Sequence, residues 1–250
     1  MGADQGAEQN YREMMSDEGT PRIVLSDLFE AVEQTPEIKQ VVDRILQKNQ
    51  PLTIVLEGSV TPENIDTIHT LISSRDNPGD RILLFDISSQ ATEEHRQYIK
   101  KAYPKRDYQV ARGDMMSLGL TSGCADLVVN DCAINYCESD QENKRTLEEI
   151  RRVLKDEDAA CLFSVVVDRQ YDDPEFGENQ ELVEEEARSI PGTFPILPEE
   201  GSPTRKCWPV PYYEDLLRQA GFSFRKFDVE RDKNNRMFRV SYRRYLLQKN

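Results

Sequence analysis

The fold is decided by residues 82–111, which read ILLFDISSQATEEHRQYIKKAYPKRDYQVA. Apolar runs at its two ends flank a stretch with helical spacing, which predicts a strand at 81–85, a helix at 92–103 and a strand at 108–111. Strands that are apolar at nearly every position are typical of parallel sheets, whose two faces are covered by helices. The stretch therefore predicts one β-α-β unit of an α/β domain.

The same alternation continues along the chain in both directions. The apolar runs predict strands at 53–56, 125–129 and 159–167, and the helical spacing predicts helices at 62–71, 146–154 and 212–220. Residues 222–229 and 237–242 predict two strands that form a hairpin through the turn Asp232-Lys233-Asn234-Asn235. We therefore predict a Rossmann-like, doubly wound seven-stranded sheet that is mostly parallel and ends in an antiparallel hairpin.

Three segments lie outside this alternation. Residues 1–21 are polar and acidic without periodicity, which predicts a flexible N-terminal arm. Residues 22–50 predict two amphipathic helices broken near Pro36, and we expect them to pack near the substrate side of the main domain, residues 51–250. Within that domain, residues 168–211 form a proline-rich acidic insert of a length typical of functional lids.

Composition narrows the classes of function. The formal net charge is -14, a field that repels phosphate backbones and anionic membranes, so we expect neither nucleic acid nor membrane as a partner. The N-terminal residues lack the basic and apolar regions of a signal peptide, which favours a cytoplasmic protein. The five cysteines form no C-x-x-C pair and only two histidines are present, so we expect free thiols and no metal site. The oligomeric state is not predicted.

Polar residues follow each predicted strand at the edge where open α/β sheets bind their ligands. Glu57-Gly58-Ser59 follows the first strand, Asp86-Ile87 the second, Asp114-Met115 the third and Asn130-Asp131 the fourth. A carboxylate after the second strand can accept hydrogen bonds from both hydroxyls of a ribose. One after the third strand can accept from an adenine amine while apolar neighbours contact the ring; Ile87, Met115 and Leu118 are placed to do so. Taken singly, an Asp at a strand end is more often a helix cap or a turn residue than a ligand contact.

Together with their flanks, these residues resemble the class I S-adenosylmethionine (SAM)-dependent methyltransferases. The segment 82–103 is similar to the second strand and helix of that family, and YQVARGDMMSLGLTSGCADLVVNDCAINYC (108–137) to its third and fourth strands. LEEIRRVLKDEDAACLFSVV (147–166) resembles the helix and fifth strand, and YYEDLLRQAGFSFRKFDV (212–229) the penultimate helix and strand. The resemblance covers roughly residues 50 to 245 in the family's order.

The resemblance implies a set of roles at the strand ends. Asp86 would hold the ribose hydroxyls of SAM, Asp114 the adenine amine, and Met115 would face the ring. Glu57 would help to orient the methionine amino group of SAM, with Gly58 and Ser59 in the loop beside it. Asn130 and Asp131 would lie near the transferred methyl, and Tyr136 near the pocket of an unidentified, small-molecule acceptor.

The first loop departs from the family pattern, acidic-x-Gly-x-Gly-x-Gly. This chain reads Glu57-Gly58-Ser59-Val60-Thr61-Pro62-Glu63, so side chains stand where the family has glycine. Three interpretations remain open: a loop that binds SAM in a modified way, a catalytically silent methyltransferase-like protein that acts through binding or scaffolding, or a different ligand. A nicotinamide-dependent oxidoreductase is disfavoured because the chain has neither a glycine-rich turn nor a Tyr-x-x-x-Lys motif.

If SAM binds, an acceptor that starts protonated needs a base near the methyl, and Asp131 is the first candidate. Asp131 could equally cap a turn, and Tyr136 could be a packing residue. We expect His69 to be a surface or core residue and His95 to lie on a solvated helix face. Arg243 and Arg244, in the last predicted hairpin, are interpreted as part of the solvated face of an amphipathic strand.

Overall fold

The computed structural model of the protein describes residues 25–58, 62–73, 75, 77–137, 139–168, 210–227 and 240–250. The predicted arm (1–21), nearly all of the acidic insert, Ser59 and the predicted hairpin turn lie outside these residues. Among the described helices, none has the length and apolar composition that a membrane span requires.

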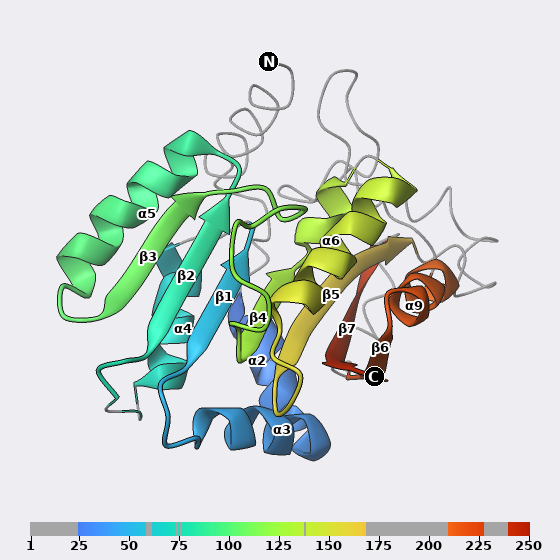
Figure 1. Ribbon diagram of the computed structural model, residues 1–250, viewed down its shortest axis with the longest axis horizontal. Coiled ribbons are helices and arrows are strands. Elements are labelled where there is room, and N and C mark those ends of the chain that lie inside the picture. The colour runs from blue at the N-terminus through green and yellow to red at the C-terminus, as the bar shows by residue number, and fades with distance from the viewer. Residues whose placement is uncertain are drawn as a thin grey trace, which may run out of the picture.

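The centre of the molecule is a seven-stranded sheet with the strand order β3-β2-β1-β4-β5-β7-β6 (Figure 1). Its strands are β1 (Thr53–Glu57), β2 (Arg81–Asp86), β3 (Asp107–Arg112), β4 (Leu127–Asp131), β5 (Ala160–Asp168), β6 (Phe222–Lys226) and β7 (Val240–Lys249). The first five pair in parallel, whereas β7 is antiparallel to both β5 and β6. The predicted sheet, mostly parallel with an antiparallel C-terminal pair, is confirmed.

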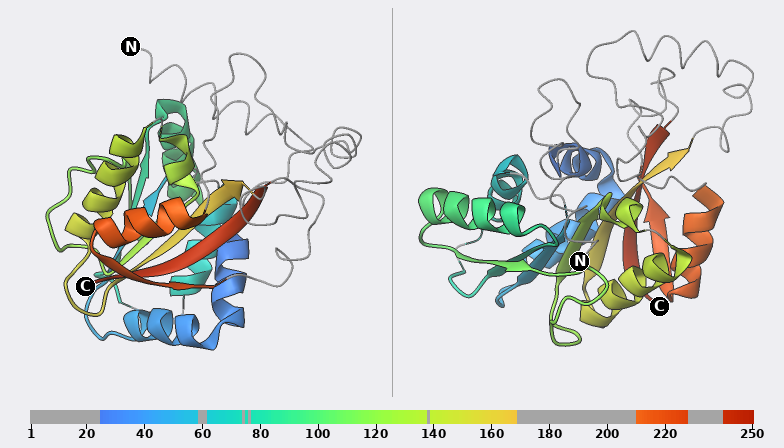
Figure 2. Two further views of the ribbon diagram at one scale, coloured as in Figure 1. Left: turned by 90° about the vertical axis from the view of Figure 1, so that its right-hand side faces the viewer. Right: turned by 90° about the horizontal axis from the view of Figure 1, so that it is seen from above.

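Helices cover both faces of the sheet (Figure 2). They are α2 (Leu25–Gln34), α3 (Pro36–Leu46), α4 (Pro62–Ile72), α5 (Ser89–Ala102), α6 (Asp140–Val153) and α9 (Val210–Gln219), with a 3-10 turn η1 (Ala133–Tyr136) after β4. Residues of α2 to α5 share one hydrophobic core with the sheet, here called the first core, and residues of α6 and α9 share the second core on the opposite face. Alternate residues of the central strands enter the two cores, as the pleat requires.

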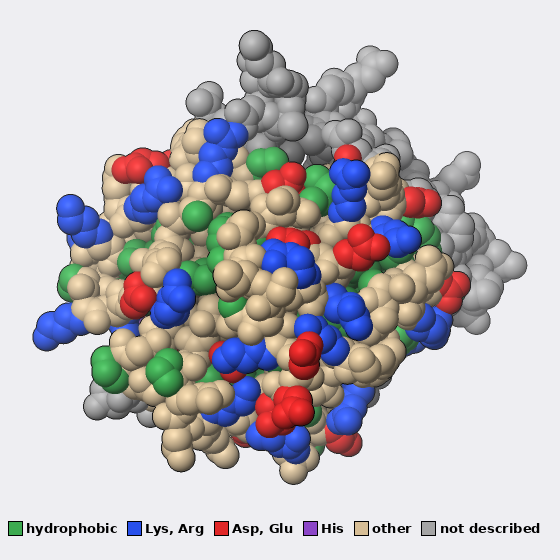
Figure 3. All heavy atoms as spheres, in the orientation of Figure 1, with side chains coloured by type: hydrophobic (Ala, Val, Ile, Leu, Met, Phe, Trp, Pro, Cys, Tyr) green, Lys and Arg blue, Asp and Glu red, His purple; other side chains and the backbone are tan. Residues whose placement is uncertain are grey.

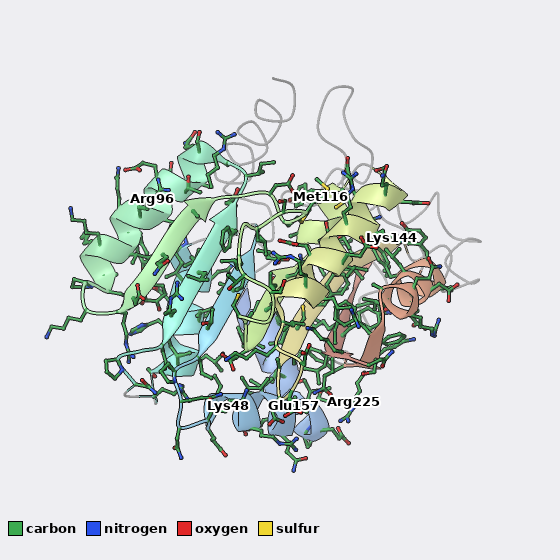
Figure 4. All side chains as sticks on the ribbon, in the orientation of Figure 1. Lys48, Arg96, Met116, Lys144, Glu157 and Arg225 are labelled. Atoms are coloured by element: carbon green, nitrogen blue, oxygen red, sulfur yellow. The ribbon has the colours of Figure 1, made fainter. Side chains whose placement is uncertain are left out.

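Buried ion pairs attach α3 to the edge of the sheet where the parallel strands begin, here called the amino-end edge. Arg75 donates to the carboxylate of Asp80 at 2.8 and 3.0 Å, and to the carbonyl oxygens of Leu46 and Lys48. Asp126, which is fully buried, accepts from Lys48 at 3.0 Å and from Lys155 at 2.8 Å. Figure 4 shows Lys48 at this edge. Because this edge faces away from the strand ends that would hold a substrate, the expectation that both N-terminal helices lie on the substrate side is wrong for α3.

Several predicted boundaries shift in ways that matter for the site. Helix α6 begins at Asp140, earlier than predicted, because the Ser139 side chain accepts a hydrogen bond from the Glu142 amide. Strand β4 includes Asn130 and Asp131, which were expected to follow the strand. Successive residues of a strand point to opposite faces, so these two side chains diverge.

His95 is also placed differently from the prediction. Its side chain is buried rather than solvated, because Ala91, His95 and Ile99 recur at the helical spacing that turns one face of α5 toward the protein interior.

Candidate functional site

The carboxyl ends of β1 to β5 form the opposite edge of the sheet, here called the carboxyl-end edge, at the top of Figure 1. The strand order reverses between β1 and β4, since the chain proceeds outward from β1 to β3 and then returns to β4 beside β1. Such a topological switch point is where open α/β sheets bind ligands. Glu57 and Asn130 are the register pair at this point.

Glu57 and Asn130 form a buried polar pair at the switch point. Asn130 donates from Nδ2 to Glu57 Oε2 at 2.8 Å, and the two side chains are 0–1% exposed. Burial raises the pKa of Glu57 to about 8, the Asn130 hydrogen bond acts in the opposite direction, and the charge of Glu149 adds to the rise. Glu57 Oε1 and Asn130 Oδ1 are buried acceptors without a hydrogen-bond partner in the described part of the chain. An unpaired buried acceptor is costly, so this pair suits a ligand that brings N–H donors.

Gly58 directly follows Glu57 in the first loop, and the structure describes its position. Its φ of 68° is left-handed, and an added Cβ would lie 2.6 Å from Ala133 Cβ in η1. Glycine is therefore required here both by conformation and by the close approach of the β1 and β4 ends. Ser59, Val60 and Thr61 lie outside the described residues, so the modified loop remains a prediction.

Asp86 and Ile87 stand at the end of β2, as predicted. Asp86 Oδ1 accepts a hydrogen bond from the Ser88 amide at 2.8 Å, and Ser88 in turn caps α5 by accepting from the Ala91 amide at 3.0 Å. These bonds fix the carboxylate at the entrance of α5. Ile87 is 41% exposed, whereas no other large hydrophobic side chain in the described residues is classed as exposed. An exposed apolar side chain beside a fixed carboxylate fits the predicted ribose and ring contacts.

The turn after β3 holds the second predicted carboxylate. Asp114 Oδ1 accepts from the Met116 amide at 2.8 Å, and the Leu118 amide donates to Glu149 Oε1 of α6 at 2.8 Å. Met116 lies between the sheet edge and α6 in Figure 4. A cavity of about 440 Å³ separates this turn from α6; it is lined by Asp114, Met116, Ser117, Arg145, Glu148, Glu149 and Arg152. Met115 is half-buried against the second core, and Leu118 lies within it.

Asp131 points away from Glu57, toward β5. Its Oδ1 accepts a hydrogen bond from Ser164, and Cys132 Sγ lies 3.8 Å from the same atom. Burial raises the pKa of Asp131, although the hydrogen bond from Ser164 and the charge of Arg244 act in the opposite direction. Cys132 has a φ of 59°, an uncommon conformation for a residue with a side chain, and it turns the chain from β4 into η1. Tyr136, half-buried, ends that turn.

The comparisons with known proteins agree with this geometry. Residues 68–157 match the model of a family described as a methyltransferase domain. This segment contains the ends of β2, β3 and β4, and it begins after β1 and the first loop. The strand order is that of the class I methyltransferase fold, and residues 68–157 resemble a methyltransferase domain. A comparison with curated protein sequences gives no match.

Solved structures with a similar fold share little of this chain's sequence. A SAM-dependent methyltransferase of Methanosarcina mazei superposes with a TM-score of 0.55 and 16% identity, over 86% of this chain and 98% of that one. The trans-methyltransferase CalH, in complex with S-adenosylhomocysteine (SAH), superposes with a TM-score of 0.54 and 15% identity, over 86% of this chain and 56% of that one. The CurJ carbon methyltransferase superposes with a TM-score of 0.52 and 15% identity, over 80% of this chain and 49% of that one. The chain thus spans about half the length of CurJ and CalH.

The fold brings the predicted residues into two groups. Glu57 and Asn130 contact each other, and Asp131 lies on the other face of the sheet. Sequence reasoning missed Ser164 and Arg244, both buried near Asp131. The interpretation of Arg244 as solvated is wrong, because β7 lies between β5 and β6 and its residues enter both hydrophobic cores. The continuous pattern Tyr245-Leu246-Leu247 was the available signal for a strand buried on both faces.

Two other side chains lie outside these groups. His69 is half-buried, stacks on Tyr103 with ring centroids 3.9 Å apart and contacts the Tyr108 hydroxyl at 3.1 Å. The expected surface or core role of His69 is confirmed. Among the described residues, no cluster of histidine, cysteine, aspartate or glutamate is suited to bind a metal ion.

Proposed function

We propose that the protein is a SAM-dependent methyltransferase that acts on a small-molecule acceptor. The observation that carries the proposal is the pair of buried, unpartnered acceptors, Glu57 Oε1 and Asn130 Oδ1, at the topological switch point. The ammonium group of SAM is a cation with N–H donors, so it would donate to both atoms and favour the ionised form of Glu57. The residues present therefore fit the donor.

The remaining contacts follow the same edge of the sheet. Asp86 would accept hydrogen bonds from the ribose hydroxyls, and Ile87 would contact a face of the adenine ring. Asp114 would accept from the adenine amine, with Met115 against the ring and Gly58 allowing close approach at the first loop. These contacts come from the ends of β1, β2 and β3, and the class I fold places those ends side by side.

SAM supplies a methyl group on a positively charged sulfur, which is already a strong electrophile. The chain's own contribution is to orient the acceptor in line with that methyl and to exclude water, and positioning of this kind can supply about 7 to 11 kcal/mol of barrier reduction. Asp131 would take a proton from the acceptor, and Tyr136 would line its pocket. The pKa of Asp131 is raised by burial, which brings it closer to the neutral pH at which a general base would work.

Charge and the known structures favour a small acceptor. The net charge of -14 disfavours nucleic acid, and on the face shown in Figure 3 acidic and basic side chains are interspersed. Similar folds include a carbon methyltransferase and an enzyme solved with SAH.

The test is calorimetric titration of the whole chain with SAM and with SAH. We expect micromolar binding of both, and binding that weakens strongly in Glu57→Gln. Asp107→Asn, a change at the exposed start of β3, is the matched control and should bind like the wild type. No heat and no thermal shift up to millimolar ligand would overturn the proposal and favour a catalytically silent binding protein.

A further inference from the structure

A row of three polar side chains crosses the sheet beside the proposed acceptor site. Asp131 of β4 is in register with Ser164 of β5, and Ser164 is in register with Arg244 of β7. Residues in register point to the same face of a sheet. This face belongs to the first core, because the residues two positions away on the three strands are Val129, Leu162 and Leu246.

Two members of the row are buried, and Asp131 is half-buried. Ser164 is 1% exposed and Arg244 is 4% exposed. A buried guanidinium is costly unless an anion lies near it, and Asp131 provides one. The side-chain groups that act on the Asp131 carboxyl are Ser164, Arg244 and Cys132, which favour its ionised form, and Asp27 of α2, which disfavours it.

The hydrogen bond from Ser164 also restricts where the Asp131 carboxylate points. Ser164 donates to Oδ1, so one carboxylate oxygen is bound to β5. The backbone supports the same contact, since the Cys132 amide donates to the Ser164 carbonyl at 3.0 Å. A carboxylate that is held by a neighbour, beside a buried cation whose charge favours its ionised form against burial, is equipped to accept a proton.

We propose that Ser164 and Arg244 are positioning residues that hold Asp131 as the ionised base for the acceptor of methyl transfer. The inference rests on the proposed function and specifies its acceptor as one that must lose a proton, a hydroxyl, an N–H or an acidic C–H. The acceptor proton moves to the Asp131 carboxylate. The electron pair left on the acceptor atom forms the new bond to the methyl carbon, and the pair of the broken C–S bond stays on sulfur.

The test is a titration of the Asp131 carboxyl by carbon NMR in the full chain labelled with 13C-aspartate, where Asp131→Asn identifies the signal. In Arg244→Met the midpoint should rise by about 1 to 3 pH units, because an opposite charge nearby lowers a carboxyl pKa by that amount. Arg243→Met is the matched control, since it removes the same charge from the adjacent residue on the opposite face of β7. The midpoint in Arg243→Met should remain close to that of the wild type.

Two milder variants keep the test decisive if Arg244→Met does not fold. Ser164→Ala should also raise the midpoint, because the Ser164 hydrogen bond favours the ionised form more than the Arg244 charge does, and Arg244→Lys should leave the midpoint near the wild-type value. Equal midpoints in the wild type and Ser164→Ala, or in Arg244→Met and Arg243→Met, would overturn the positioning roles.

Titration with SAH on the same proteins separates this inference from the proposed function. Wild-type protein that binds SAH while the Asp131 midpoint is insensitive to Arg244 and Ser164 would refute the positioning roles alone. Wild-type protein that does not bind SAH would refute the proposed function, whatever the midpoints.

Discussion

Both edges of the sheet bury carboxylates, but they satisfy them differently. At the amino-end edge, Asp80 is bound by Arg75 and by the Leu52 amide, and Asp126 is bound by two lysines and the Thr53 amide. At the carboxyl-end edge, Glu57 has one hydrogen bond, to Asn130, and an oxygen without a partner in the described residues.

The difference indicates what each edge is for. A buried carboxylate that has a cation and backbone donors connects segments of the chain, here α3 and the starts of β1 and β2. A buried carboxylate with an unused oxygen costs stability until a ligand binds. We therefore expect substitutions at the amino-end edge to change stability, and those at the carboxyl-end edge to change affinity for SAM and SAH.

The largest expected effect is on the stability of the amino-end edge. Arg75→Met leaves Asp80 buried without its cation and should lower the free energy of unfolding by about 3 to 5 kcal/mol, measured by urea denaturation. Arg96→Met, which removes an exposed pairing with Glu93, should cost less than about 1 kcal/mol. If the two variants lose the same stability, the amino-end edge does not have the structural role assigned to it.

At the carboxyl-end edge, Glu57→Gln should change ligand affinity rather than lower stability. Losing a charge-assisted hydrogen bond of about 1.5 to 3 kcal/mol should weaken SAH binding by about 10- to 150-fold. Stability should be unchanged or higher, because a buried carboxyl with an unpaired oxygen is replaced by a neutral amide. Calorimetry and urea denaturation on one preparation measure both quantities, and a large loss of stability with unaltered affinity would reverse our distinction between the edges.

A smaller effect is expected from Asp86→Asn, which keeps an oxygen for the Ser88 amide and removes the charge facing the ribose. SAH binding should weaken by about tenfold, the effect of losing about 1.4 kcal/mol. Ser88→Ala separates affinity from stability, since losing the α5 cap should cost about 1 kcal/mol of stability and leave affinity unchanged. Retained affinity in Asp86→Asn would contradict the ribose assignment.

The last expected effect is a difference between the two edges in how stability depends on pH. The pKa of Glu57 is raised from 4.5 to about 8 in the folded protein, so its contribution to stability is complete below pH 4.5 and is lost as the pH rises through about 8. The contribution of Asp80 to stability depends on pH in the opposite direction. Burial acts to raise the pKa of Asp80, but the hydrogen bonds from Arg75 and the Leu52 amide outweigh it and lower that pKa below 3.8.

The contribution of Asp80 is therefore present above pH 3.8 and lost as the pH falls. Urea denaturation of the wild type and Glu57→Gln between pH 5 and 8 checks the Glu57 part. The wild type should lose more stability than the variant over this range, and parallel curves would contradict the assignment.

Much of the fold could be predicted because its signals are local. The apolar runs at 53–56 and 81–85 and the helical spacing between them report strands and helices directly. Boundaries were less predictable: the strand predicted at 125–129 includes Asn130 and Asp131, and the last strand, predicted at 237–242, extends to Lys249. Periodicity does not show where a strand ends when polar residues continue its hydrogen-bonded ladder.

Residue types and order along the chain determined the α/β class, the class I methyltransferase arrangement and the carboxylates that follow β1, β2 and β3. Only the tertiary structure decided that Glu57 meets Asn130, that Asp131 instead meets Ser164, and that Arg244 is buried. These contacts join residues between 33 and 73 positions apart. They depend on strand order, register and the alternation of side chains between faces, which no local pattern of the sequence specifies.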